Sequence, residues 1–146
     1  QGNVVEGKFG KAIQFSARQK GGNSNVKPGN SLVDPKWTQD IPIYVRAMVL
    51  AGKHLFIVGP PDVIDEEETF QKLTESDEQV QQLLAQQDQA LSGSEGAMLL
   101  AINTDTGEAV HGLQLNSLPQ WDGLAAANGR LFLSTRDGKV ICFAGE

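Results

Sequence analysis

The sequence predicts an all-β fold of antiparallel strands that is interrupted by one acidic helix, and three observations lead to it. Short apolar runs alternate with turns built on glycine, asparagine and aspartate. One segment, residues 62–95, carries most of the negative charge. A pattern of eight residues recurs on both sides of that segment. The 146 residues fit about one domain of ordinary size.

Paired apolar runs predict the strands. The pairs Asn128-Gly129 and Asp137-Gly138 favour the positive φ angles that tight turns between twisted strands require. The expected strands are 43–50, 54–58, 97–102, 108–115, 123–127, 130–134 and 139–143. We expect 41–61 and 97–143 to form antiparallel sheets, with a core that includes Val45, Met48, Leu50, Phe56, Val58, Leu100, Ile102, Leu131, Leu133 and Ile141.

Charge separates the middle of the chain from its flanks. Residues 62–95 hold ten acidic side chains and one lysine, whereas 1–61 sum to +5 and 96–146 to −2. This acidic run lacks the loop spacing of a calcium site. The segment is therefore a different kind of structure from the strands around it.

Between Asp65 and Leu91 the segment has no glycine or proline and is rich in helix formers. Apolar residues recur there at about helical spacing, namely Leu73, Val80, Leu84 and Leu91. Acidic residues 65–68 suit the start of a helix, and Ser76 with Gln79 offers a second start as a capping box. The pattern predicts a solvated helix docked along one narrow seam, with an acidic partner-binding surface as the alternative.

A repeat is visible once the acidic segment is set aside. Residues 51–58 (AGKHLFIV) and 127–134 (ANGRLFLS) align at an offset of 76, which falls to 42 without the 34 residues of 62–95. Units of roughly 40–45 residues with four antiparallel strands each are the period of propeller blades. The sequence thus predicts about two incomplete propeller-like blades, with the helix inserted between the second and third strands of the first.

Two stretches are similar to a known repeat. Residues 100–108 (LAINTDTGE) and 128–140 (NGRLFLSTRDGKV) resemble parts of PQQ-like, quinoprotein-type propeller repeats. The likeness covers about 37–61 and 96–145. The repeat usually has tryptophan where His111 stands, so the resemblance implies a different contact between blades here.

The N-terminal region is similar to another family. Residues 5–15 (VEGKFGKAIQF) resemble the opening strand of laminin-G or concanavalin-like lectin domains. We divide the chain into a lectin-like strand at 1–17, a flexible basic linker at 18–36, and a propeller-like β domain at 37–146. We expect segment 3–15 to add a strand to one of the sheets. The combination resembles large exported proteins of planctomycete-type bacteria, which implies a periplasmic or extracellular location.

Catalysis finds little support in the residues. No His-Glu-x-x-His or Gly-x-Ser-x-Gly motif occurs, and we expect no catalytic residue, cofactor or metal. The single cysteine, Cys142, excludes an internal disulfide, and we expect a buried thiol. A net charge of −6 argues against nucleic-acid binding. No run approaches the length of a membrane-spanning helix, so membrane insertion is not expected. A quinoprotein dehydrogenase would need a complete propeller, so the chain alone is predicted not to be an enzyme.

Binding is the more promising activity. Trp37, Tyr44 and Trp121 lie near strand starts, where loops carry ligands or partners. Asp122 beside Trp121 would pair a stacking face with a hydrogen-bond acceptor, as in sugar sites. The alternative is that both tryptophans pack in the core or between blades.

These observations favour a non-enzymatic structural or protein-interaction module of an exported assembly. Open sheet edges are templates for pairing, and strand addition by a protein partner covers them. A carbohydrate-binding, lectin-like module is the first alternative. A non-catalytic remnant of a quinoprotein dehydrogenase propeller is the second.

Overall fold

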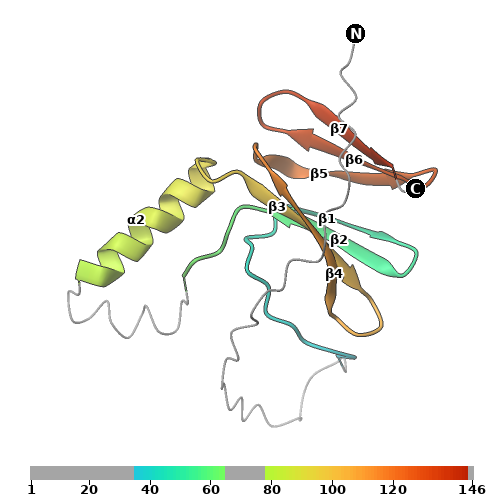
Figure 1. The fold of residues 1–146 in the computed structure, drawn as a ribbon, viewed down its shortest axis with the longest axis horizontal. Helices are drawn as coiled ribbons and strands as arrows, with labels where there is room; N and C mark the ends of the chain where they lie inside the picture. The colour runs from blue at the N-terminus through green and yellow to red at the C-terminus, as the bar shows by residue number, and fades with distance from the viewer. Residues whose placement is uncertain (1–34, 65–77, 145–146) are drawn as a thin grey trace.

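The computed structural model describes residues 35–64 and 78–144, which form two antiparallel sheets and one helix (Figure 1). The first sheet holds, in chain order, β1 (Ala47–Ala51), β2 (His54–Gly59), β3 (Ala97–Asn103) and β4 (Ala109–Leu115). The second sheet holds β5 (Pro119–Ala127), β6 (Arg130–Thr135) and β7 (Val140–Ala144). The helix α2 (Glu78–Ser92) lies between β2 and β3 in the chain. The predicted all-β fold of two open, incomplete blade-like sheets is confirmed.

The strand order follows from local turn chemistry and from pairing across the insertion. Asn128 and Gly129 adopt φ of 51° and 70°, so the turn between β5 and β6 has the two positive φ angles that this pair favours. β2 pairs directly with β3, with Ile57 opposite Leu100, although the whole insertion separates them in sequence. The helix is therefore an insertion between the second and third strands of a continuous sheet, as predicted.

The main core lies between the two sheets. Side chains of alternate residues on β1 to β4 meet those of the second sheet, because successive residues of a strand point to opposite faces. Val58 and Leu99 of the first sheet and Leu124, Leu133 and Phe143 of the second are all buried in this cluster. β1 lies against β5, so the two sheets are closest along these strands.

A second apolar cluster covers the opposite face of the first sheet, which we call its far face. Ile57, Leu100 and Ile102 are buried there beneath the segment 35–46, which brings Ile43 and other apolar side chains onto them. Backbone hydrogen bonds from Tyr44 N to Pro60 O (2.9 Å) and from Arg46 N to Val58 O (2.9 Å) hold that segment along β2. The far face of the first sheet is thus covered over its middle strands.

The predicted core is right for most residues and wrong for two. Val58, Leu100, Ile102, Leu131 and Leu133 are buried, and Val45, Phe56 and Ile141 are half-buried against one of the two clusters. Met48 and Leu50, by contrast, are 60% and 64% exposed. Both project from the far face of β1, because their cross-strand partners are Ile57 and Leu55. No described residue covers the far face at that edge.

The helix α2 projects to one side of the sheets (Figure 1). It is held near its C-terminal end, where the Gln87 side chain accepts a hydrogen bond from Val63 N (2.8 Å) and donates one to Pro61 O (3.2 Å). Val80, Gln87 and Ala90 are its buried residues, whereas Leu84 of the predicted seam is 37% exposed. The predicted seam is thus right at Val80 and at the half-buried Leu91 and wrong at Leu84, and Gln87 and Ala90 share the buried side of the helix.

Several predictions fall outside the described residues. These are the lectin-like strand 1–17, the strand at 3–15, residues 18–34 of the linker, Leu73, the acidic run 65–68 and Ser76. In the described part of the chain, no helix has the length and apolar character needed to cross a membrane.

Candidate functional site

Three of the four predicted binding residues come together where β1 and β5 begin. Tyr44 lies shortly before β1, which begins at Ala47, and Trp121 and Asp122 belong to β5. A backbone hydrogen bond from Asp122 N to Arg46 O (3.1 Å) joins the two segments at this point. Arg136 lies beside the start of β5, where its backbone N donates a hydrogen bond to Leu118 O (2.8 Å). We call Tyr44, Arg46, Trp121 and Arg136 the aromatic–arginine cluster.

An irregular stretch of β5 turns Trp121 outward. The pairing of β5 with β6 shifts register between Pro119 and Leu124, and within that stretch Asp122 has φ of 53°. A bulge redirects side chains and often occurs at a binding site. Positive φ in a residue other than glycine is also uncommon. As a result Trp121 is 61% exposed although it lies inside a strand.

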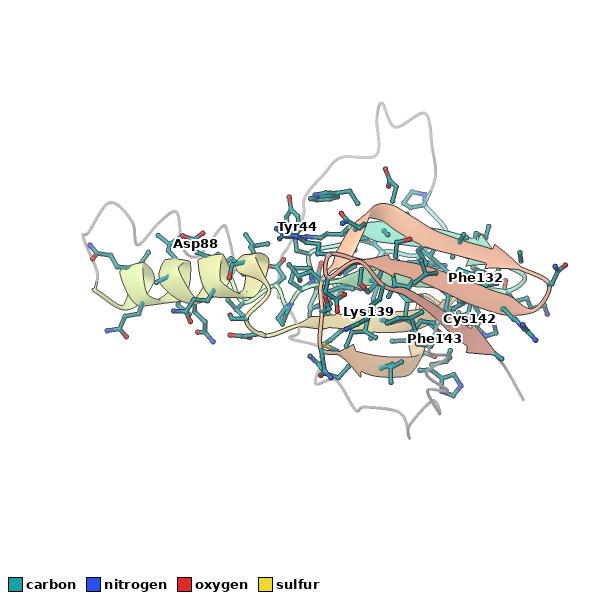
Figure 2. All side chains as sticks on the ribbon, turned by 90° about the horizontal axis from the view of Figure 1, so that it is seen from above. Tyr44, Asp88, Phe132, Lys139, Cys142 and Phe143 are labelled. Atoms are coloured by element: carbon teal, nitrogen blue, oxygen red, sulfur yellow. The ribbon has the colours of Figure 1, made fainter. Side chains whose placement is uncertain are left out.

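The two aromatic rings form an exposed corner. The centres of the Tyr44 and Trp121 rings are 6.3 Å apart, and their planes meet at 82°, which is the edge-to-face geometry that aromatic pairs favour. Tyr44 is 48% exposed. Figure 2 shows Tyr44 between the helix and the sheets, near the end of α2 that joins the body of the protein. The corner is therefore open to solvent.

Arg46 supports this corner from within. It is only 9% exposed, and its guanidinium carbon lies 5.3 Å from the centre of the Trp121 ring, within the range of a cation–π contact. Its Nη2 donates a hydrogen bond to the carbonyl oxygen of Leu91 (2.8 Å) in the last turn of α2, where a helix carries partial negative charge. Its Nε is buried and has no hydrogen-bond partner among the residues that the structure describes.

The charge of Arg46 is not neutralised by a nearby carboxylate. Burial lowers the pKa of its guanidinium, the positive charge of Arg136 lowers it further, and Tyr44 acts in the opposite direction. Arginine nevertheless keeps its proton in proteins. Within residues 35–64 and 78–144, no carboxylate forms an ion pair with Arg46; the pairs there are Lys36 with Asp105 and Lys139 with Asp137.

Trp37 lies apart from the other predicted binding residues. Its indole Nε1 donates a hydrogen bond to Thr104 O (2.8 Å), and its half-buried ring lies against Gly107 in the turn between β3 and β4. A Cβ added to Gly107 would lie 2.7 Å from atoms of that ring. Lys36 binds Asp105 of the same turn through a 2.8 Å ion pair. This position matches the packing alternative for Trp37.

Sequence reasoning missed the two arginines. Arg46 stands in the apolar run 43–50, and a lone charged residue in such a run is a usable sign of a special environment. Arg136 precedes a turn, and nothing in its local sequence connects it with residues of β1. Only the contact between the two sheets brings these positions together.

A cavity of about 400 Å³ opens between the sheets at the end of β1 and β5 that lies away from the aromatic–arginine cluster. Its lining is mostly apolar and comprises Ala51, Phe56, Ala126, Ala127, Asn128, Gly129, Arg130, Leu131 and Phe143.

The histidines and the cysteine of the described residues lie apart from one another. In the described ranges, no group of three His, Cys, Asp or Glu residues is arranged to hold a metal ion. His54 lies half-buried beside Phe56, and His111 is exposed on β4. Cys142 is half-buried rather than buried as predicted, because it pairs with Phe132 on the face of β7 that points away from the main core.

The cluster can hold a ligand by stacking and by charge. It presents two exposed rings and a poorly compensated cation, with the exposed Asp122 carboxylate alongside. Groups of this kind are suited to contacting and orienting a ligand, and among the described residues of the cluster there is no serine, cysteine or histidine. Comparison of the chain with protein-family models, with curated proteins and with solved structures gave no match.

Proposed function

We propose that this chain is a non-enzymatic structural or protein-interaction module of an exported assembly, in which a partner strand completes the second sheet. The observation that carries the proposal is the difference between the sheets. Within the described residues 35–64 and 78–144, the first has four strands, whereas the second has three, with β7 as its outer strand. Export is implied by the family resemblance alone.

The outer strand β7 lacks the features that protect natural sheet edges. Its sequence, VICFA, contains no charged residue and no proline, and such residues are what usually prevent an edge from pairing with another chain. Val140 is 65% exposed, and Cys142 and Phe132 are half-buried on the face away from the core. An apolar, unprotected edge of this kind favours the addition of a strand.

The resemblance to PQQ-like repeats supports the same proposal. In a propeller, blades lie face to face around a common axis, and the two sheets here meet along β1 and β5 in a comparable way. A further strand or blade, from another chain or from another part of the same polypeptide, would continue that arrangement.

The test is the native mass of the chain after an edge substitution. Val140→Lys places a charge on the edge at an exposed position, so we expect it to block pairing without unfolding the sheet. Met48→Lys is the matched control, because Met48 is 60% exposed but lies on the first sheet. We expect light scattering to show a species larger than the 15.7 kDa monomer for the wild type and for Met48→Lys, and the monomer for Val140→Lys.

Two results would count against the proposal. A wild-type chain that stays at 15.7 kDa at every concentration, and whose β7 amides exchange with solvent as fast as those of exposed loops, has no completed edge. A large species that survives Val140→Lys unchanged would place the contact elsewhere.

Carbohydrate binding is a second candidate, favoured by a specific observation. Trp121 is 61% exposed, and the neighbouring Asp122 is exposed and available as an acceptor. An aromatic face combined with a few oriented polar groups is the usual composition of a small-ligand site. Glycan screening with the wild type and Trp121→Ala tests it, and equal retention of both proteins would contradict it.

A further inference from the structure

We propose that the aromatic–arginine cluster binds a saccharide that carries a carboxylate, such as a uronate unit, with its ring against Trp121 and its carboxylate held by the positive charge of Arg46 and Arg136. The proposal rests on the carbohydrate-binding candidate above and names its ligand class. It is independent of the pairing at β7.

The first argument is that the positive charge of Arg46 has no carboxylate partner among the described residues. The side chain is nine-tenths buried, yet in the described part of the chain it has one hydrogen-bond acceptor, the Leu91 carbonyl, and its Nε has none. A buried charge is costly unless it is paired and hydrogen-bonded. Because no carboxylate in the described ranges pairs with Arg46, an anion supplied by a ligand would relieve this cost.

The second step is the like charge beside it. Arg136 is exposed, and its backbone N donates a hydrogen bond to Leu118 O (2.8 Å), which places it beside the start of β5, where Thr135 pairs with Pro119. Its positive charge lowers the pKa of Arg46. Two arginines that repel each other both gain from an anion between or above them. A guanidinium also binds a carboxylate in bidentate geometry, which makes arginine well suited to the role.

The third step is the stacking surface. The perpendicular Tyr44 and Trp121 rings leave an exposed apolar corner next to the cation. The apolar C–H face of a sugar ring matches such a surface in size and character, while the sugar hydroxyls need acceptors. Asp122 supplies an exposed carboxylate there, on a backbone with φ of 53°. Uncommon backbone conformations of this kind concentrate at functional sites.

The experiment compares two probes with the same sugar chain, one with free carboxylates and one with neutral methyl esters. Binding of trigalacturonate and of its fully methyl-esterified form is measured by calorimetry on the full chain at low salt. We expect at least tenfold tighter binding of the acid form. That preference should weaken as salt is raised, because an exposed charge such as that of Arg136 is screened.

Two variants locate the site. Arg136→Gln alters an exposed side chain, so we expect it to fold and to weaken binding of the acid form several-fold while leaving the ester unaffected. Trp121→Ala should weaken both forms by at least tenfold. Arg130→Gln is the matched control, because Arg130 is an exposed arginine at the other end of β5 and β6 and should change neither affinity.

Each outcome decides the matter. Equal affinity for acid and ester overturns the acidic ligand and leaves a neutral carbohydrate site in place. Failure of the wild type to bind either probe overturns this inference, and a negative glycan screen alongside it removes the carbohydrate candidate as well. Binding that resists both Trp121→Ala and Arg136→Gln overturns the location.

Discussion

Leu133→Ala tests the packing of the two sheets most directly. Leu133 is 0% exposed and lies in the middle of β6, opposite Leu124 on one side and Ile141 on the other. A leucine-to-alanine change in a core costs about 2–5 kcal/mol, depending on how far the site can collapse. Both sheets surround this side chain and limit collapse, so we expect about 3–5 kcal/mol, a large part of the roughly 5–15 kcal/mol that stabilises a domain.

The assay is urea denaturation followed by tryptophan fluorescence and circular dichroism. With a slope of about 2 kcal/mol/M, the expected loss lowers the midpoint by about 1.5–2.5 M. Trp37 reports on the first sheet and Trp121 on the second. Val140→Ala is the control, because its side chain is 65% exposed and such changes usually stay within about 0.5 kcal/mol.

Two results would refute the reasoning. A loss below about 1 kcal/mol for Leu133→Ala would mean that the sheets do not enclose this residue. Separate transitions by fluorescence and by circular dichroism in the wild type would mean that the sheets unfold independently. Leu100→Ala, at a site 1% exposed in the far-face cluster, should give the same slope as Leu133→Ala if the fold is one cooperative unit.

Two further predictions concern a turn glycine and an acidic side chain. Gly107→Ala should lower the free energy of unfolding by at least about 2 kcal/mol, because φ is +77° and the new methyl would meet the Trp37 ring. Gly52→Ala, with φ of +62° and open space around it, should lower it by only about 1 kcal/mol, the cost of the backbone conformation. Equal losses of stability for the two variants in urea denaturation would contradict this. Hydrogen bonds from Lys139 and Thr135 hold the pKa of Asp137 at about 2, below its value in the unfolded chain. The contribution of the Asp137 carboxylate to folding stability is therefore complete above about pH 4 and is lost as pH falls toward 2. Asp137→Asn should therefore melt below the wild type at pH 6 and together with it near pH 2; a gap that stays constant with pH would exclude this role.

The turns and strand pairing could be predicted from the sequence because they depend on local chemistry. Asn128-Gly129 adopts the two positive φ angles that a tight hairpin needs. The pairing of β2 with β3 across the insertion followed from the repeat alone, since 51–58 and 127–134 each form the turn and second strand of a sheet. These features required no knowledge of what lies on either face.

The buried face of β1 could not be predicted in the same way. Residues 47–51 are apolar at every position, so alternation does not distinguish one face from the other. Ala47 and Val49 face the second sheet, whereas Met48 and Leu50 lie where neither that sheet nor the segment 35–46 covers them. Burial there is decided by the partner surface.

The candidate site also owes part of its make-up to the sequence and part to the tertiary structure. The sequence by itself determined which residue types stand at strand starts, including Tyr44, Trp121 and Asp122, because those positions follow from the turns. Only the tertiary structure decided that these three meet, that Trp37 packs against a turn instead, and that Arg46 and Arg136 place positive charge among them. The physical reason is that the site forms where two sheets touch, and contacts between residues so distant in sequence leave no local pattern.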